Sequence, residues 1–203
     1  MLKIYGNRMS SNANKVEYTV VALGMEYEYK DMDFQKDLKT EWYMKLNPSG
    51  KIPTIDDDGF ILFESVAICK YLCDKKGSDL YPKDLKKRAI VEQWIDFTIQ
   101  HVASAVAKIA FAKIFGPMMG KAVDEAGAKE GDELLKRFLP IVDAQIGKHK
   151  FLVFDKLSLA DIILLASLQY TEPLKYDLSP YKNLSAWRKK MMEMDFYKKV
   201  HNQ

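Results

Sequence analysis

The stretch Asn47-Pro48-Ser49-Gly50-Lys51-Ile52-Pro53-Thr54-Ile55 decides how the first part of the chain folds. Asn-Pro-Ser-Gly predicts a tight turn, because proline presets φ, glycine reaches positive φ, and Asn and Ser side chains bond nearby backbone groups. Ile52 to Ile55 then predicts a strand, which its proline restricts to a strand start, an edge or a bulge. Ile52-Pro53 is also the best candidate for a cis peptide bond.

A hairpin and a helix are expected directly after this strand. Asp-Asp-Asp-Gly at positions 56–59 carries the Asp-Gly signal of a tight hairpin loop. Phe60 to Phe63 predicts the returning strand. Glu64 and Ser65 then open a helix, whose apolar positions are Val66, Ile68, Cys69, Leu72 and Cys73.

The junction between this strand and this helix predicts a ligand site. The first turn of a helix has unpaired N–H groups and a partial positive charge, which favour a carboxylate. A kinked strand start beside it leaves the backbone of Ile52 able to pair with an extended peptide. Together these features predict a cradle for a small, acidic, peptide-like ligand.

The residues before this stretch predict a β-α-β unit. Leu2 to Tyr5 and Glu26 to Lys30 alternate between apolar and polar residues, so both predict strands. Between them, a helix is expected to begin near Ser11 and to end at about Leu23. A helical crossover makes the two strands parallel neighbours. A short helix is expected around Glu41 to Lys45, in an otherwise irregular segment.

Strand signals stop after a candidate linker, Ser-Asp-Leu-Tyr-Pro-Lys at 78–83, and the rest of the chain predicts helices. Ser158 and Asp161 form a capping-box variant before a run that is apolar almost all round, as in a central buried helix. The other expected helices cover 88–115, ended by Gly116-Pro117, then 132–146, where Pro140 can kink the chain, and finally 183–194 and 196–200.

Composition excludes several classes of function. The 203 residues carry a net charge of +3, too little to indicate a nucleic-acid partner or an anionic membrane. Cys69 and Cys73 have no second cluster, so we expect reduced packing residues and no metal site. The start of the chain lacks the apolar core of a signal peptide, and no window of about 20 residues is free of charge. We therefore expect no membrane span and a reducing, cytoplasmic setting.

Two motifs connect these elements to a known family. The run Asn-Pro-x-Gly-Lys-Ile-Pro-Thr at 47–54, followed by Phe-Glu-Ser-x-Ala-Ile at 63–68, resembles the glutathione-binding signature of soluble glutathione transferases. The resemblance extends over nearly the whole chain. It implies an α/β N-terminal thioredoxin-like domain (βαβ-α-ββα) over 1–77, a linker over 78–85, and an all-α C-terminal helical bundle domain over 86–203.

The resemblance also implies a reaction and a set of partners. The thiolate of glutathione would attack a small hydrophobic electrophile, as in detoxification, with glutathione as co-substrate and no cofactor. Members of the family are usually homodimers, in which the first domain of one subunit lies against the helical domain of the other. Neither a nucleic acid nor a membrane is an expected partner.

A serine hydroxyl is the expected thiolate donor. A free thiol has a pKa of about 8.5, and lowering this pKa by about two units requires the thiolate to be stabilised by roughly 2.7 kcal/mol. A single hydrogen bond to a charged group supplies about this much. The segment from Arg8 to Val16 is similar to the serine-type classes, phi and theta, which implies Ser10 as donor and Ser11 as second candidate. Without the resemblance, either serine can equally be explained as an ordinary helix N-cap. Tyr5 is the rival, since other classes use a tyrosine near the end of this strand.

The resemblance implies further contacts with glutathione, position by position. Glu64 and Ser65 match the pair that holds the γ-glutamyl amine and carboxylate, which agrees with the physics of a helix N-terminus. Ile52, before Pro53, matches the residue whose backbone pairs with the cysteinyl part. Asn12 is expected to orient the donor or the ligand.

Lys39 and Lys51 match basic residues that reach the glycyl carboxylate, although either can simply be a solvated surface charge. Many serine-type members have a histidine just before the first of these lysines, where this chain has Leu38. In this family the electrophile lies between the domains, which makes Arg8 and Met9 candidates. The helical stripe Ala105, Lys108, Ile109, Ala112 and Phe115 is another candidate or simply core.

Two alternatives to conjugation remain open. One is a glutathione-dependent peroxidase or reductase on the same scaffold, acting through the same thiolate. The other is a non-catalytic transferase-fold binding or regulatory protein, which would retain Glu64 and Ser65 without turnover. No cysteine lies near Ser10, which argues against disulfide chemistry through a protein thiol.

Overall fold

A computed structural model describes residues 1–201 and divides the chain into two compact units. The first unit comprises Met1–Tyr81 together with the helix α10 (Asp195–His201), and the second comprises Pro82–Glu193. No helix in the described part of the chain has the length and apolar content needed to cross a membrane.

The first unit is built on a four-stranded sheet. Its strands are β1 (Leu2–Gly6), β2 (Tyr27–Asp31), β3 (Thr54–Asp57) and β4 (Phe60–Phe63), in the order β2-β1-β3-β4. The first two pair in parallel, as predicted, and the other two pairings are antiparallel. The third strand begins after Pro53, because proline cannot donate a ladder hydrogen bond.

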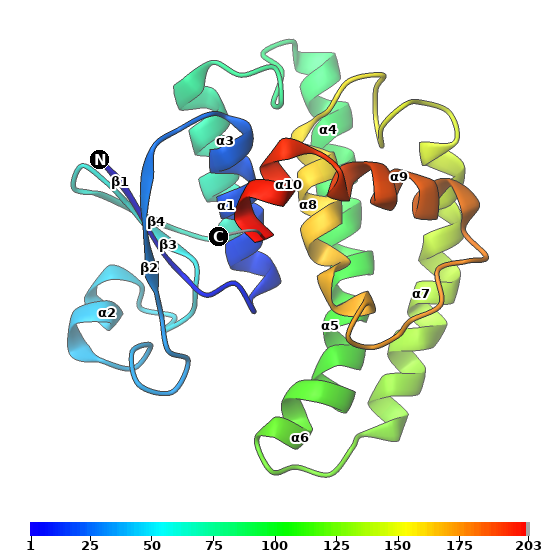
Figure 1. The fold of residues 1–203 in the computed structure, drawn as a ribbon, viewed down its shortest axis with the longest axis horizontal. Coiled ribbons are helices and arrows are strands. Elements are labelled where there is room, and N and C mark those ends of the chain that lie inside the picture. The colour runs from blue at the N-terminus through cyan, green and yellow to red at the C-terminus, as the bar shows by residue number, and fades with distance from the viewer. Residues whose placement is uncertain (202–203) are drawn as a thin grey trace. The chain divides into compact units, whose positions relative to one another are not determined.

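Helices lie against both faces of this sheet (Figure 1). Helices α1 (Ser11–Ala22) and α3 (Ser65–Lys76) pack against each other, and α10 packs on α1. Because side chains alternate along a strand, the fully buried Ile4 and the half-buried Tyr5 face opposite sides. The Tyr5 ring meets Tyr43 of α2 (Glu41–Leu46) at a centroid distance of 6.3 Å, which places α2 on the second face.

Every regular element in the described part of the second unit is a helix. One long run combines two α-helices, two π-helical segments and a final short turn: α4 (Leu85–Phe97), η1 (Thr98–Ala103), α5 (Ser104–Ala110), η2 (Phe111–Phe115) and α6 (Gly116–Met118). Helix α7 (Glu125–Ile146) returns beside α5 (Figure 1). The chain then forms α8 (Leu159–Ser167), the 3-10 turn η3 (Gln169–Thr171) and α9 (Lys182–Met192).

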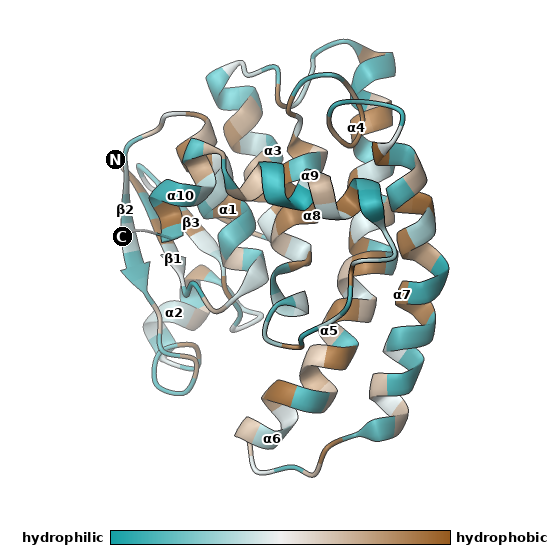
Figure 2. Ribbon diagram, turned by 45° about the vertical axis from the view of Figure 1, so that its right-hand side comes forward, coloured by the Kyte–Doolittle hydropathy of each residue, from teal (hydrophilic) through white to brown (hydrophobic). Residues whose placement is uncertain are grey.

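Helix α8 is the buried centre of this unit. All of its residues are buried, whereas hydrophilic and hydrophobic residues alternate along α7 (Figure 2). The predicted capping box is confirmed. The Asp161 carboxylate accepts hydrogen bonds from Ser158 N (3.0 Å), Ser158 Oγ (2.7 Å), Leu152 N (2.7 Å) and Trp187 Nε1 (3.0 Å). One buried carboxylate therefore ties the start of α8 to the preceding loop and to α9.

Several helix boundaries differ from the sequence prediction, and two of the differences have a clear local cause. Gly116-Pro117 does not end the long run, which continues to Met118, because Pro117 stands in the first turn of a new α segment, where no N–H is needed. Helix α7 begins at Glu125 rather than at Asp132, since Asp124 caps it by accepting a hydrogen bond from Gly127 N (2.9 Å).

The sequence did not predict the early start of α7, because the first part of this helix contains glycines, which are poor helix formers. Gly131 is nevertheless required there, because a Cβ would lie 2.6 Å from Ile109 Cγ1 and 3.0 Å from the Ala105 carbonyl oxygen. Glycine thus permits α7 and α5 to approach closely. The thioredoxin-like α/β unit followed by a helical unit confirms the predicted fold class. Cys69 and Cys73 are free and buried, as expected for packing residues.

Candidate functional site

The N-terminus of α3 presents unpaired polar groups. Glu64 is its N-cap residue, with φ 72° and ψ 107°, and its side chain makes no capping hydrogen bond. That carboxylate is exposed and has no hydrogen bond or ion pair among the described residues, and the same holds for the half-buried Ser65 hydroxyl. A carboxylate, a hydroxyl and the N–H groups of the first helical turn are therefore open to a ligand that carries both an ammonium and a carboxylate.

The loop before β3 holds its backbone open beside this helix. Both Asn47 Nδ2 and the Tyr43 hydroxyl donate to the Lys51 carbonyl oxygen, each at 2.7 Å. The predicted cis bond between Ile52 and Pro53 is present. The Ile52 side chain is buried, while its backbone N–H and C=O form no hydrogen bond within the described residues. An extended peptide could pair with these two groups.

Ser10 combines a capping role with an unused hydroxyl proton. It is the N-cap residue of α1, and its Oγ accepts a hydrogen bond from Ala13 N at 3.4 Å. The N-cap alternative is thus present in the structure. However, the hydroxyl proton has no acceptor in the described chain, so Ser10 can cap the helix and still donate to a ligand. Ser11 is the first residue of α1 and is half-buried.

Two exposed lysines lie near the turn between α2 and β3. Lys39 and Lys51 have no ion-pair partner among residues 1–201. A Cβ at Gly50, where φ is +58°, would lie 2.8 Å from Lys39 Nζ, so this ammonium lies against the loop that carries Lys51. Leu38 is only 7% exposed and belongs to a core cluster with Ile52. Its side chain is therefore part of the core, not of the exposed surface.

The rival and accessory candidates differ in what their side chains contact, and the Tyr5 hydroxyl, like that of Ser10, donates to no acceptor among the described residues. The Tyr5 ring packs on Trp42 at a centroid distance of 5.9 Å. The Arg8 guanidinium donates to the buried Glu17 carboxylate, from Nε at 3.1 Å and from Nη2 at 2.7 Å. Met9 is half exposed. In the second unit, Ala105, Ile109 and Ala112 of the predicted stripe are buried.

Lys15 is a residue of this region that the sequence patterns did not single out. It is only 2% exposed, and its Nζ donates to Asn12 Oδ1 at 2.7 Å. Burial lowers the pKa of Lys15 to about 8. The available signal was the spacing of three residues, which places the two side chains on one face of a helix.

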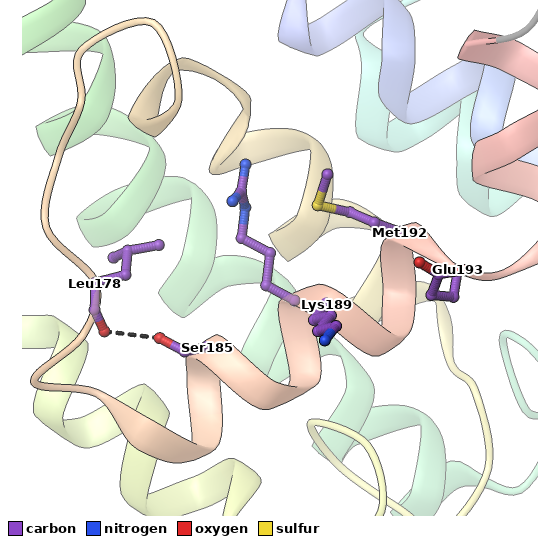
Figure 3. A pocket seen from close by; sticks show the side chains of 6 residues that line it. Leu178, Ser185, Lys189, Met192 and Glu193 are labelled. Atoms are coloured by element: carbon purple, nitrogen blue, oxygen red, sulfur yellow. Dashed lines mark hydrogen bonds between the residues drawn. The ribbon is translucent and has the colours of Figure 1, made fainter.

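Two surface hollows in the second unit contain none of the predicted glutathione ligands. One, of about 300 Å³, lies between α9 and the loop before it. Figure 3 shows the Ser185 hydroxyl there donating to the Leu178 carbonyl oxygen, at 2.7 Å. The other, of about 380 Å³, lies beside Ile109 of α5 and Ala128 of α7. The free polar groups of the candidate site all belong to the first unit.

Both parts of the chain match models of one protein family. Residues 1–74 match the family model of the glutathione S-transferase N-terminal domain, and residues 106–195 match that of the C-terminal domain. The chain is 32% identical to glutathione S-transferase F10 of Arabidopsis thaliana, over 98% of this chain and 96% of that protein.

Two solved structures have nearly the same fold. Glutathione transferase F7 from Populus trichocarpa has a TM-score of 0.91 and 28% identity, and the match covers 100% of this chain and 98% of that one. A glutathione S-transferase I bound with lactoylglutathione has a TM-score of 0.90 and 31% identity, over 99% and 98% of the two chains.

Proposed function

The chain belongs to the glutathione S-transferase family, and on that premise we propose that it joins the thiol of glutathione to small hydrophobic electrophiles. The observation that carries this proposal is the set of unused polar groups around one end of the first unit. An exposed carboxylate, a hydroxyl at a helix N-terminus and an open backbone at a cis-proline match the groups of the tripeptide.

Glutathione would bind along these groups from end to end. The Glu64 carboxylate receives the γ-glutamyl ammonium, and the Ser65 hydroxyl and N–H receive the γ-glutamyl carboxylate. The backbone of Ile52, before Pro53, pairs with the cysteinyl part. Lys39 and Lys51 attract the glycyl carboxylate as unpaired ammonium groups, which compensates for the absence of a histidine at Leu38.

The thiolate would be stabilised by a serine, as in the phi and theta classes. Ser10 is the preferred donor because its hydroxyl proton has no acceptor among the described residues, and because it stands at the positive end of α1. Ser11 is the second candidate. Asn12 offers its carboxamide NH₂ to the ligand, since its oxygen already accepts from Lys15.

A homodimer in the cytoplasm is the proposed form of the protein. The edge strand β4 exposes Phe60 (50%) and Phe63 (37%), while α4 exposes Leu85 (81%) and Ile90 (41%). Apolar groups of this size gain from contact with a second copy of the chain. The free cysteines are compatible with a reducing compartment.

The direct test is turnover with glutathione and a small chromogenic aryl halide, beside a parallel assay with an organic hydroperoxide. Conjugation faster than the uncatalysed reaction, lost in Ser10→Ala, supports the proposal. Reduction of the hydroperoxide without conjugation would instead identify a glutathione-dependent peroxidase. Glutathione binding without either reaction would identify a non-catalytic binding protein.

A further inference from the structure

Lys15 is a buried ammonium without a carboxylate partner. Its side chain on α1 is 2% exposed, and its Nζ makes a single hydrogen bond, to Asn12 Oδ1 at 2.7 Å. No Asp or Glu of the described chain lies within ion-pair distance of it. Burying an uncompensated cation is costly, and proteins usually pair such a group or let it lose its proton.

The titratable groups of the surrounding helices do not supply the missing negative charge. On α1 itself, the Glu17 carboxylate is engaged by Arg8 and by the Tyr27 hydroxyl. On α3, burial raises the pKa of the Cys69 thiol to about 12, so this thiol is neutral, and it donates to the Lys15 carbonyl oxygen at 3.3 Å.

Burial likewise raises the pKa of the Cys73 thiol on α3. Lys70 of the same helix is a further cation. On α10, His201 shares a hydrogen bond with the Tyr18 hydroxyl at 2.6 Å. The helices packed around Lys15 therefore leave its charge open to an anion that arrives with a ligand.

The contact with Asn12 shows where that anion would be. An ammonium can only donate, so the atom it meets is the carboxamide oxygen, and the NH₂ group of Asn12 is left for another partner. Asn12 is exposed and lies in the first turn of α1, two residues after Ser10. The buried charge thus stands behind the turn where the thiolate is proposed to form.

We propose that Lys15 is a positioning residue for the glutathione thiolate, fixing the Asn12 carboxamide with its NH₂ toward the ligand and supplying the positive charge that favours the ionised thiol. This inference rests on the proposed function. It predicts that Lys15, without touching the ligand, makes the thiol of bound glutathione more acidic than it would be with a neutral residue at this position.

Lys15→Met tests the charge while filling the buried space. The bound thiol should become less acidic by about one pKa unit, which lowers the thiolate fraction, and with it kcat/KM, about tenfold at pH 6. At pH 9.5 the thiol is ionised in both proteins, so the difference should nearly vanish. The KM for glutathione should change little, and Lys15→Arg, which retains the charge, should restore the wild-type pH profile.

A matched control separates charge from structure. Thr19→Val removes the hydrogen bond from Thr19 Oγ1 to the Lys15 carbonyl oxygen (2.8 Å) in the same buried segment, without removing a charge. It should leave the thiol pKa unchanged. A shift as large as that of Lys15→Met would overturn the inference, as would a Lys15→Met protein with a wild-type thiol pKa.

Lys15→Gln keeps the test decisive if Lys15→Met does not fold. It removes the charge, while its amide can still donate to Asn12 Oδ1, and it should also raise the thiol pKa. An unshifted thiol in Lys15→Gln counts against the inference. If wild-type protein binds glutathione without any shift of its thiol pKa, the proposed function itself fails. If the thiol pKa of bound glutathione is lowered in wild type and equally lowered in the Lys15 variants, only the role of Lys15 is refuted.

Discussion

Replacing Glu64 should separate the stability of the fold from the binding of its ligand. Glu64 occupies φ 72° and ψ 107°, a backbone region that residues with a Cβ rarely adopt. Such a conformation costs on the order of 1–3 kcal/mol and is found mainly where function requires it. The exposed carboxylate has no partner among the described residues, so it does not offset this cost to the stability of the fold.

The effect of this backbone strain on the free energy of unfolding can be obtained by comparing two substitutions. Glu64→Ala keeps the strain, because alanine has a Cβ. Glu64→Gly relieves it, but it adds roughly 0.5–1 kcal/mol of chain entropy to the unfolded state. The free energy of unfolding should therefore be about 1 kcal/mol higher for Glu64→Gly than for Glu64→Ala, which corresponds to a Tm difference of about 2–4 °C in a chain of this length.

Both substitutions should weaken glutathione binding alike. Each removes the proposed charged partner of the γ-glutamyl ammonium, and a hydrogen bond to a charged group is worth roughly 1.5–3 kcal/mol, or about 10- to 150-fold in Kd. Urea unfolding measures the stability of each variant, and isothermal titration calorimetry measures its affinity for glutathione. Equal stability of the two variants would refute the strain argument. Wild-type affinity in either variant would remove Glu64 from the ligand site.

The other predictions concern the anchor of the ligand and two buried carboxylates. Ser65→Ala should weaken glutathione affinity about tenfold in calorimetry, since a hydrogen bond to a charged group is lost, and unaltered affinity would remove that assignment. Asp161→Ala leaves four buried donors unpaired and should lower the free energy of unfolding by on the order of 4 kcal/mol in urea titrations; a loss below about 1 kcal/mol would contradict this. Burial opposes ionisation of Asp57, but hydrogen bonds from Lys75 and Tyr71 outweigh it and lower its pKa. Its contribution to stability is therefore present above about pH 4 and is lost as the pH falls further, so Asp57→Asn should differ from wild type in thermal melts at pH 7 but not at pH 2.

Local signals in the sequence predicted most of the first unit. The hairpin at 56–59 and the α8 capping box depend on residues within a few positions of one another, and both are present. The N-cap role of Ser10 also follows from its neighbours. Long-range contacts could not be read in the same way. Gly131 is explained only by the approach of α7 to α5.

The same limit applies to the candidate site. Its ligand groups were predicted from two motifs and a family resemblance, but the left-handed backbone of Glu64 and the contact of Lys39 with Gly50 depend on the folded chain. The sequence did not single out Lys15, because neither its burial nor its lack of a carboxylate partner can be inferred from α1 alone.

Titrating the thiolate absorbance of bound glutathione shows whether Ser10 stabilises the glutathione thiolate. Wild type and Ser10→Ala would be measured in parallel, with melting curves to allow for the lost helix cap, which is worth about 1 kcal/mol. We expect a bound-thiol pKa between roughly 6 and 7 in wild type, and a return toward the free value of about 8.5 in Ser10→Ala. The same lowered pKa in both proteins would rule out Ser10 as the thiolate donor.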